Sequence, residues 1–390
     1  MLLPVLILLA SRIQPADVAV PFRQPQLAAA HGQVAMVFGG GRAIYFAASA
    51  DQGRTFRTPV KVAEVGALAL GRHRGPRLAI LKTVMVISAV VGDSASTGPH
   101  AHGSPESGNL AVWRSTDRGR TWKRAGIIND VPSSAREGLH AMVAGPEGGL
   151  FAAWLDLRAK GTQLYGSRST DGGVTWQKNV LIYNSPDGSI CQCCHPSLSI
   201  DASGRIFAMW RNSLDGSRDL YFTSSTDGKS FASAQKLGTG TWKLNACPMD
   251  GGAFAVEKGK VISAWRRDGE VFLTDADGVE RKVGTGKDVA LAQGKRGTYL
   301  AWTQDAAIQV LLPKATEPKM VGPAGAFVNL LALPDGGVLV AWEANASVET
   351  TRLDYNLTFT PAHAARGAPG ARKVERCSGY SPPMTGNGRA

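Results

Sequence analysis

The residues Ser115-Thr116-Asp117-Arg118-Gly119-Arg120-Thr121-Trp122 decide how this chain folds. The same form, Ser-x-Asp-x-Gly-x-Thr followed by an aromatic residue, recurs at 49–56 and 169–176, and a copy one residue shorter occupies 225–231. In a hairpin turn the aspartate carboxylate accepts backbone N–H groups, the glycine adopts a positive φ and the aromatic ring packs under the turn. The motif therefore predicts four hairpin turns. We interpret its aspartates as structural rather than as catalytic or calcium-binding groups.

Short apolar strands that end in tryptophan form a second repeat, in phase with these turns. Weaker copies of the strand lie at 34–38 and 84–90, so seven units are visible, and 46 glycines in 390 residues supply the turns between them. A hydrophobic content of 44% is enough for a sizeable core. The pattern favours an all-β chain with many turns. The five strong copies end at Trp154, Trp210, Trp265, Trp302 and Trp342.

The turns are Asp boxes, and residues 22–353 resemble the sialidase-like family of BNR-repeat propellers. The resemblance implies an all-β fold, a six- or seven-bladed β-propeller of four-stranded antiparallel blades. Sialidases have six blades, whereas seven strand repeats are visible here, so one weak unit is either a blade or an insertion. We expect a strand near Ala19–Phe22 to complete the last blade and close the ring.

The two ends of the chain differ in composition from the region between them. The apolar run at 2–10 is typical of a short signal peptide, with a buried first strand as the alternative. We therefore expect a signal peptide at 1–18, the propeller at 19–358 and a flexible, basic, Gly/Pro-rich tail at 359–390, in a periplasmic or secreted protein. No apolar run approaches the ~18 residues of a spanning helix, so we expect no transmembrane segment.

The net charge of +12 favours an anionic partner. The sequence has no nucleic-acid-binding motif, so we expect an anionic glycan or a small anionic ligand, no nucleic acid, and a monomer.

The direction of the chain in each strand predicts on which of the two faces of the propeller each polar connection lies. Strands alternate in direction within a blade, so Asp boxes lie at one face and the connections between blades at the other. Those connections are rich in Arg, His, Cys and carboxylates, and we expect them to converge on one axial pocket. They occupy 73–77, 136–140, 191–196 and 245–250.

The resemblance to sialidases implies three arginines that clamp a substrate carboxylate, an Asp acid/base, and a Tyr nucleophile activated by a Glu. Phe22-Arg23-Gln24-Pro25 matches the element that supplies the first arginine, and His73-Arg74-Gly75-Pro76 is a rival match. For each arginine the alternative is a structural ion pair. The candidate clamp residues are Arg23, Arg74, Arg136, Arg211 and Arg267; the candidate catalytic residues are Asp93 as the acid, Glu137 as the base and Tyr221, with Tyr355 as a rival tyrosine.

A cysteine cluster departs from the sialidase pattern. In an oxidising compartment, Cys247 would form a disulfide with Cys191, Cys193 or Cys194. Alternatively, these four thiolates, together with His195, His140 or the pair His100 and His102, would bind copper or zinc. Cys377, in the tail, is expected to stay unpaired with the core. Three hypotheses follow: a sialidase-like hydrolase without a cofactor, a non-catalytic binding propeller, and a metal-handling protein.

Overall fold

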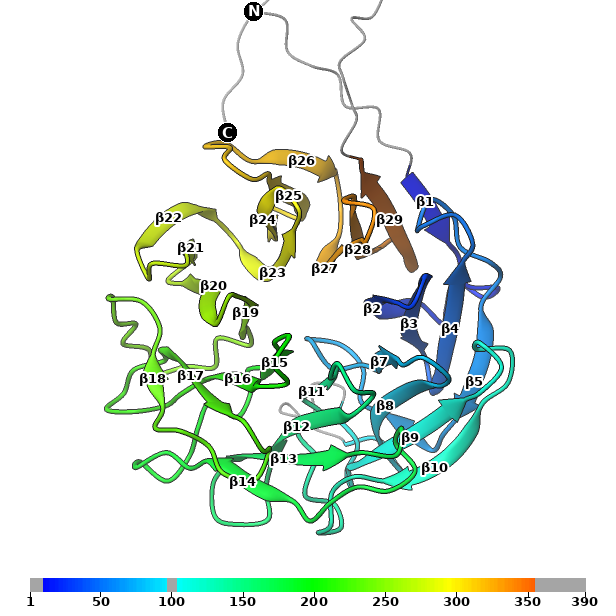
Figure 1. Ribbon diagram of the computed structural model, residues 1–390, viewed down its shortest axis with the longest axis horizontal. Helices are drawn as coiled ribbons and strands as arrows, with labels where there is room; N and C mark the ends of the chain where they lie inside the picture. The colour runs from blue at the N-terminus through cyan, green and yellow to red at the C-terminus, as the bar shows by residue number, and fades with distance from the viewer. Residues whose placement is uncertain (1–9, 97–103, 355–390) are drawn as a thin grey trace, which may run out of the picture. The chain divides into compact units, whose positions relative to one another are not determined.

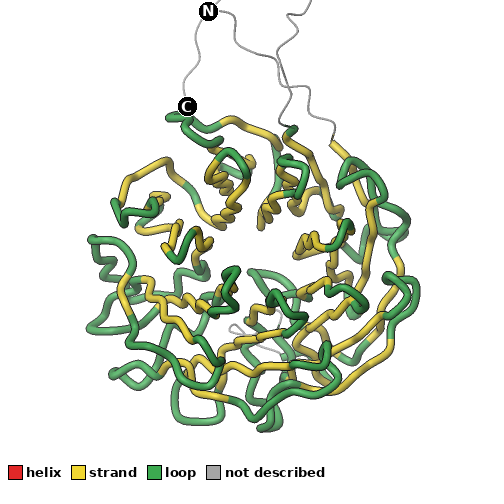
Figure 2. Tube along the Cα trace, in the orientation of Figure 1, coloured by secondary structure: helices red, strands yellow, loops and turns green. Residues whose placement is uncertain are grey.

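The computed structural model describes residues 10–96 and 104–354. This part of the chain forms 29 strands and no helix, arranged as seven sheets around a common axis (Figures 1 and 2). The protein is a seven-bladed β-propeller, so the predicted fold class is confirmed and the six-bladed alternative is wrong. Within the described residues, no helix is long and apolar enough to cross a membrane.

Blades 1 to 4 follow one another along the chain. Blade 1 contains β2 (Phe22–Ala30), β3 (Gln33–Gly40), β4 (Ala43–Ser49) and β5 (Val60–Glu64). Blade 2 contains β6 (Ala67–Leu68), β7 (Arg77–Ile80), β8 (Met85–Gly92), β9 (Asn109–Ser115) and β10 (Lys123–Ile127). Blade 3 contains β11 (His140–Ala144), β12 (Leu150–Asp156), β13 (Gln163–Ser169) and β14 (Val180–Tyr183). Blade 4 contains β15 (Ser197–Ile200), β16 (Ile206–Arg211), β17 (Leu220–Ser225) and β18 (Gln235–Lys236).

The last three blades complete the ring. Blade 5 contains β19 (Gly252–Glu257), β20 (Lys260–Arg267), β21 (Glu270–Thr274) and β22 (Glu280–Thr285). Blade 6 contains β23 (Lys287–Gly294), β24 (Gly297–Gln304), β25 (Ala307–Leu311) and β26 (Lys319–Gly322). Blade 7 contains β27 (Ala326–Ala332), β28 (Val338–Ala344), β29 (Ser347–Leu353) and β1 (Ala10–Ile13). The innermost strands β2, β7, β11, β15, β19, β23 and β27 contact one another in that order, and β27 contacts β2 (Figure 1).

The second strand of each blade forms the core. The tryptophan repeat lies on these strands, as predicted: Trp154, Trp210, Trp302 and Trp342 are at most 1% exposed. The weaker copies at 34–38 and 84–90 lie on or beside β3 and β8, so both are true blades. Apolar side chains buried on both faces of the second strands let neighbouring blades pack face to face.

The Asp boxes have the predicted hairpin geometry. In the first, Asp51 accepts hydrogen bonds from the Thr55 backbone N–H (2.8 Å), the Thr55 hydroxyl (2.6 Å) and the Ser49 hydroxyl (2.8 Å). Gly53 has φ +84°, a region that favours glycine. All four boxes connect the two outermost strands of blades 1 to 4, which in the five-stranded blade 2 are β9 and β10. Their aspartates are therefore structural.

The ring is closed by β1, which pairs antiparallel with β29 from Ala10↔Thr351 to Ile13↔Val348. The predicted closing strand near Ala19–Phe22 is wrong, because Phe22 begins the innermost strand of blade 1. The closing strand is the outermost strand of blade 7, and the chain must then cross a blade to reach the axis. Four strands span about 15 Å at ~4.8 Å spacing, so residues 14–21 are needed for the crossing. The closing strand thus lies inside the stretch assigned to a signal peptide.

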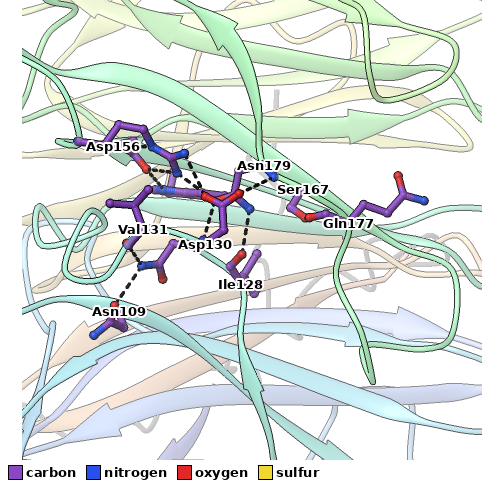
Figure 3. Close-up of polar contacts among 11 residues, drawn as sticks. Asn109, Ile128, Asp130, Val131, Asp156, Ser167, Gln177 and Asn179 are labelled. Atoms are coloured by element: carbon purple, nitrogen blue, oxygen red, sulfur yellow. Dashed lines mark hydrogen bonds and ion pairs between the residues drawn. The ribbon is translucent and has the colours of Figure 1, made fainter.

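Blades 2 and 3 are joined by a polar network at the face opposite the Asp boxes (Figure 3). Arg158 donates hydrogen bonds to both carboxylate oxygens of Asp156 (2.8 and 2.9 Å) and to Asp130 of the preceding connection (2.9 Å). The backbone N–H groups of Asp130 and Asn179 bond to each other's side chains. Every polar group in this network has a partner inside the protein, which indicates a structural role.

Candidate functional site at the hub

Several innermost strands begin with a strained residue that faces the axis. Gln24, Asp288 and Phe327 have φ of 57°, 56° and 53°, and each lies at an interruption in the pairing of β2, β23 or β27 with the second strand. His73 has φ 66° in the turn before β7. A left-handed backbone costs a non-glycine residue about 1–3 kcal/mol, and such residues concentrate at functional sites. Gln24, His73 and Phe327 line one axial cavity and Asp288 bonds His73, so this end of the axis is the candidate site.

Two carboxylates lie beside the same ring nitrogen of His73. Its Nε2 lies 2.9 Å from Asp288 Oδ1 and 3.9 Å from Asp250 Oδ1. Its ring lies 4.2 Å from the ring of His195 and meets Phe327 edge-on, with centroids 5.1 Å apart. The imidazole is therefore fixed in position while part of its side chain, 13%, remains exposed.

The pKa values of the two carboxylates behind His73 are shifted in opposite directions. Burial, together with the charge of Asp288, raises the pKa of Asp250. Burial also acts to raise the pKa of Asp288, but the hydrogen bond and charge of His73 outweigh it, and the pKa lies below its usual value. Asp250 Oδ1 and Asp288 Oδ2 are buried without a hydrogen-bond partner among the described residues. Carboxylates with separated pKa values are a property of acid–base sites.

His195 is neutral and has a defined tautomer. Burial and the nearby positive groups lower its pKa well below its usual value. Its Nδ1 accepts a hydrogen bond from the Gly251 backbone N–H (3.2 Å), so the proton lies on Nε2. Donor atoms of His73, His195 and Asp250 lie within 4.8 Å of one another, close enough for a metal ion. His195 thus belongs to the hub and not to the thiol group in which it was predicted.

An axial cavity of about 270 Å³ opens beside these histidines. All seven innermost strands or the residues just before them line it, and its polar lining includes Gln24, His73, Arg77 and His195. The Arg77 guanidinium donates to the carbonyls of His73, Gly75 and Pro76, which fixes the turn that carries His73. Of the four connections predicted to converge on one axial pocket, 73–77 and 191–196 line this cavity, and Asp250 of 245–250 lies behind His73; 136–140 is not part of the lining.

The five predicted clamp arginines do not gather at this cavity. Arg211 is buried and donates to backbone carbonyls, Arg74 bonds Ser104 and the Glu137 carbonyl, and Arg267 pairs with Glu280. Arg136 reaches only the Ser133 carbonyl. Arg23 pairs with Glu343 (3.4 Å), which also binds Gln24, and keeps 42% of its side chain exposed. Of the five, Arg211 and Arg23 adjoin hub residues, Asp250 and Gln24 in turn, and of these two only Arg23 is partly exposed.

The three predicted catalytic residues lie apart from one another. Asp93 lines a separate cavity of about 300 Å³ with Glu64 and Arg124. Glu137 lies near the cysteines, where burial raises its pKa. Tyr221 is on β17, with its ring 6.4 Å from that of Trp210, and burial and the charge of Asp219 raise its pKa. Tyr355, His100, His102 and Cys377 lie outside the described residues.

The predicted metal ligands separate into two places. His140 is fully buried, and its Nε2 bonds the Ser88 hydroxyl (3.0 Å), away from the thiols. The sulfur atoms of Cys191, Cys193 and Cys194 lie 2.9–4.0 Å apart. Cys247 is exposed, and these four described cysteines form no disulfide with one another. The disulfide and the metal site both stay predictions.

Comparisons with known proteins agree with the propeller. The family described as a BNR repeat-like domain matches residues 84–256. A comparison with curated proteins returns no significant match. The chain resembles an α-L-arabinanase of Penicillium chrysogenum complexed with arabinobiose (14% identity, TM-score 0.53, 88% of this chain and 97% of that one). It also resembles a Hadza microbial sialidase (13%, 0.53, 89% and 68%) and a leech intramolecular trans-sialidase (13%, 0.52, 90% and 70%).

The predicted resemblance to the sialidase-like, BNR-repeat β-propellers is thereby confirmed. At 13–14% identity the solved structures establish the fold alone.

Proposed function

We propose that the protein is an exported sialidase-like glycoside hydrolase that acts on an acidic sugar at the hub. The observation that carries the proposal is His73 at the axial cavity, with its Nε2 bonded to Asp288 and Asp250 close behind. A volume of about 270 Å³ suits one terminal sugar unit. The partly exposed Arg23 near the cavity, together with the net charge of +12, favours a substrate that carries a carboxylate.

In this proposal His73 touches the substrate and the two aspartates act through it. The imidazolium donates its proton to the departing glycosidic oxygen, water attacks the anomeric carbon, and the proton from that water returns to the imidazole. Asp288 fixes the ring and stabilises its positive charge, as a buried carboxylate does behind a catalytic histidine. Asp288, which makes the hydrogen bond to His73, is the principal counter-ion, and Asp250 lies farther from the ring.

The test is hydrolysis of a panel of chromogenic glycosides, acidic sialosides and glucuronides beside neutral arabinofuranosides, from pH 4 to 8. We expect turnover of an acidic member, and a loss of at least ~100-fold in kcat/KM for His73→Gln and Asp288→Asn. Asp93→Asn is the matched control: it removes a carboxylate at the separate cavity and should keep wild-type activity. Absence of turnover across the panel, or full activity of a correctly folded His73→Gln variant, would refute the assignment.

A binding propeller without turnover is the second candidate, favoured by the internal pairing of the predicted arginines. Isothermal titration of the wild-type protein with the same acidic sugars separates the two. Binding that His73→Gln weakens, with no product formed, would support this candidate over hydrolysis.

A further inference from the structure

The connection between β14 and β15 places three thiols against one another. Cys191 Sγ lies 3.6 Å from Cys193 Sγ and 2.9 Å from Cys194 Sγ, and the third separation is 4.0 Å. All three side chains are at most 4% exposed. The Cys191 backbone N–H donates to the Arg211 carbonyl (3.1 Å), which ties the loop to β16. Three buried donors are thus fixed within the span of one metal ion.

Further sulfur atoms adjoin this group from the connection between β18 and β19. Met249 packs against the three cysteines. The exposed Cys247 lies near enough to Cys193 for the two thiols to influence each other's pKa. Sulfur is therefore the shared donor type, and Cys247 gives the buried group a contact with solvent. Thiolate and thioether ligands select soft metals such as Cu(I).

Two buried arginines supply positive charge beside the thiols. Arg74 is 1% exposed, and its Nη1 has no hydrogen-bond partner among the described residues. Its charge interacts with Cys193 and Cys194, and that of Arg211 with Cys191. Glu137, also near Cys193, pairs with Arg74 at 3.7 Å. An anionic metal–thiolate group would satisfy the arginines, whereas three neutral thiols leave their charge less compensated.

We propose that Cys191, Cys193 and Cys194 bind one Cu(I) ion as three thiolates, with Cys247 as the residue through which the ion enters. Sulfur atoms about 2.3 Å from a central ion in a plane lie about 4 Å apart. Two of the three separations already match, and binding would move Cys191 and Cys194 apart by about 1 Å. Three thiolates and one Cu(I) carry a charge of −2, which Arg211 and Arg74 offset in part, since Arg74 also pairs with Glu137. The thiol protons pass to solvent on binding.

The experiment is an anaerobic titration of the reduced full-length protein with Cu(I), in competition with a chromogenic Cu(I) chelator. We expect one tightly held ion per chain and an X-ray absorption spectrum with a first shell of sulfur only. Cys191→Ser and Cys194→Ser should each weaken binding more than 100-fold, since changes behind the ligands alone cost 10–100-fold. Cys377→Ser, a change outside the described residues, is the matched control and should leave the affinity unchanged.

The Cys247→Ser variant tests whether Cys247 only admits the Cu(I) ion or is also one of its ligands. It should retain one ion with near wild-type affinity while slowing metal exchange with the chelator. Loss of the ion in this variant would overturn the three-coordinate assignment. Preference for Zn²⁺ over Cu(I), or a Cys191–Cys194 disulfide that persists under mild reductant in peptide mapping, would overturn the proposal as a whole. Thermal unfolding of each variant establishes that it is folded.

This inference stands apart from the proposed hydrolase. Asp288→Asn, which should abolish turnover at the hub, should leave Cu(I) affinity unchanged. The hydrolase proposal and the Cu(I) proposal can therefore be refuted independently of each other.

Discussion

Replacement of Arg211 by Met distinguishes a structural arginine from a substrate clamp. The guanidinium is 1% exposed and donates to the carbonyls of Arg218 (2.6 Å), Asp250 (2.9 Å) and Arg266 (3.0 Å), with a longer contact to Gly251 (3.3 Å). It also lies over the Trp242 ring at 5.3 Å. Met preserves much of the apolar stem but leaves three buried carbonyls without their charged donor.

The expected cost follows from these contacts. Hydrogen bonds to charged groups contribute about 1.5–3 kcal/mol each, and breaking a buried charged arrangement costs about 3–5 kcal/mol in all, so we take about 4 kcal/mol. With an unfolding entropy of about 2.1 cal/mol/K per residue over roughly 345 residues, Tm should fall by about 5–6 °C. Arg23→Met is the control: its single pair with Glu343 is partly exposed and should cost about 1 kcal/mol or less.

The assay is thermal unfolding by circular dichroism together with urea titration, followed by titration with acidic sugars. A Tm within 1 °C of wild type, combined with lost sugar binding, would refute the structural role and restore Arg211 as a ligand clamp. A large drop in Tm for Arg23→Met would refute the expectation that a partly exposed ion pair contributes much less to stability than the buried Arg211.

Three further changes test other parts of the fold. Burial acts to raise the pKa of Asp51, but hydrogen bonds from Thr55 and Ser49 outweigh it and hold the pKa at about 2. Because the folded value lies below the unfolded one, this stabilisation is present above about pH 4 and is lost as the pH falls toward 2. Asp51→Asn should therefore lower Tm modestly at pH 7 and less at pH 3. Equal losses of Tm at both pH values would show that the lowered pKa of Asp51 does not contribute to stability. Trp302→Ala, at a position with no exposed surface, should lower the free energy of unfolding measured by urea titration by about 3–5 kcal/mol. Trp176→Ala, which removes a half-buried Asp-box ring, should lower it clearly less. Ile13→Asp should release β1 and expose the edge of β29, seen as a lower Tm and as self-association in light scattering; a monomer with unchanged Tm would argue against closure by β1.

The repeats made the architecture predictable because each is a local pattern. An Asp box closes its own turn with contacts only a few residues apart, as Asp51 and Thr55 show, and a tryptophan strand signals burial on both faces. Blades 5 to 7 lack Asp boxes, but Trp265, Trp302 and Trp342 still marked their second strands. The closing strand was missed because its pairing with β29 joins residues more than 330 positions apart.

The hub residues were predictable as a group of connections but not one by one. Sequence order placed 73–77, 136–140, 191–196 and 245–250 at one face, and the contacts of Arg74 with Glu137 and of His73 with Asp250 bear this out. Asp288 and Phe327 were missed because no motif marks them: each reaches the site through a pairing irregularity just inside an innermost strand. The signal available was a polar or aromatic residue directly before an apolar first strand. The arginines were assigned to ligand binding because sialidases use arginines in that way. Most of the backbone carbonyls around Arg211 come from distant parts of the chain, so the sequence could not reveal them.

Closure by β1 also determines how the ring responds to force. Ala10 lies opposite Thr351 and Ile13 opposite Val348, so the outward ends of the two antiparallel strands are adjacent. A pull applied to both would load their hydrogen bonds one after another, as in a zipper, rather than all at once in shear. The seventh blade is therefore where the circle would open first under tension, with the other six sheets still folded.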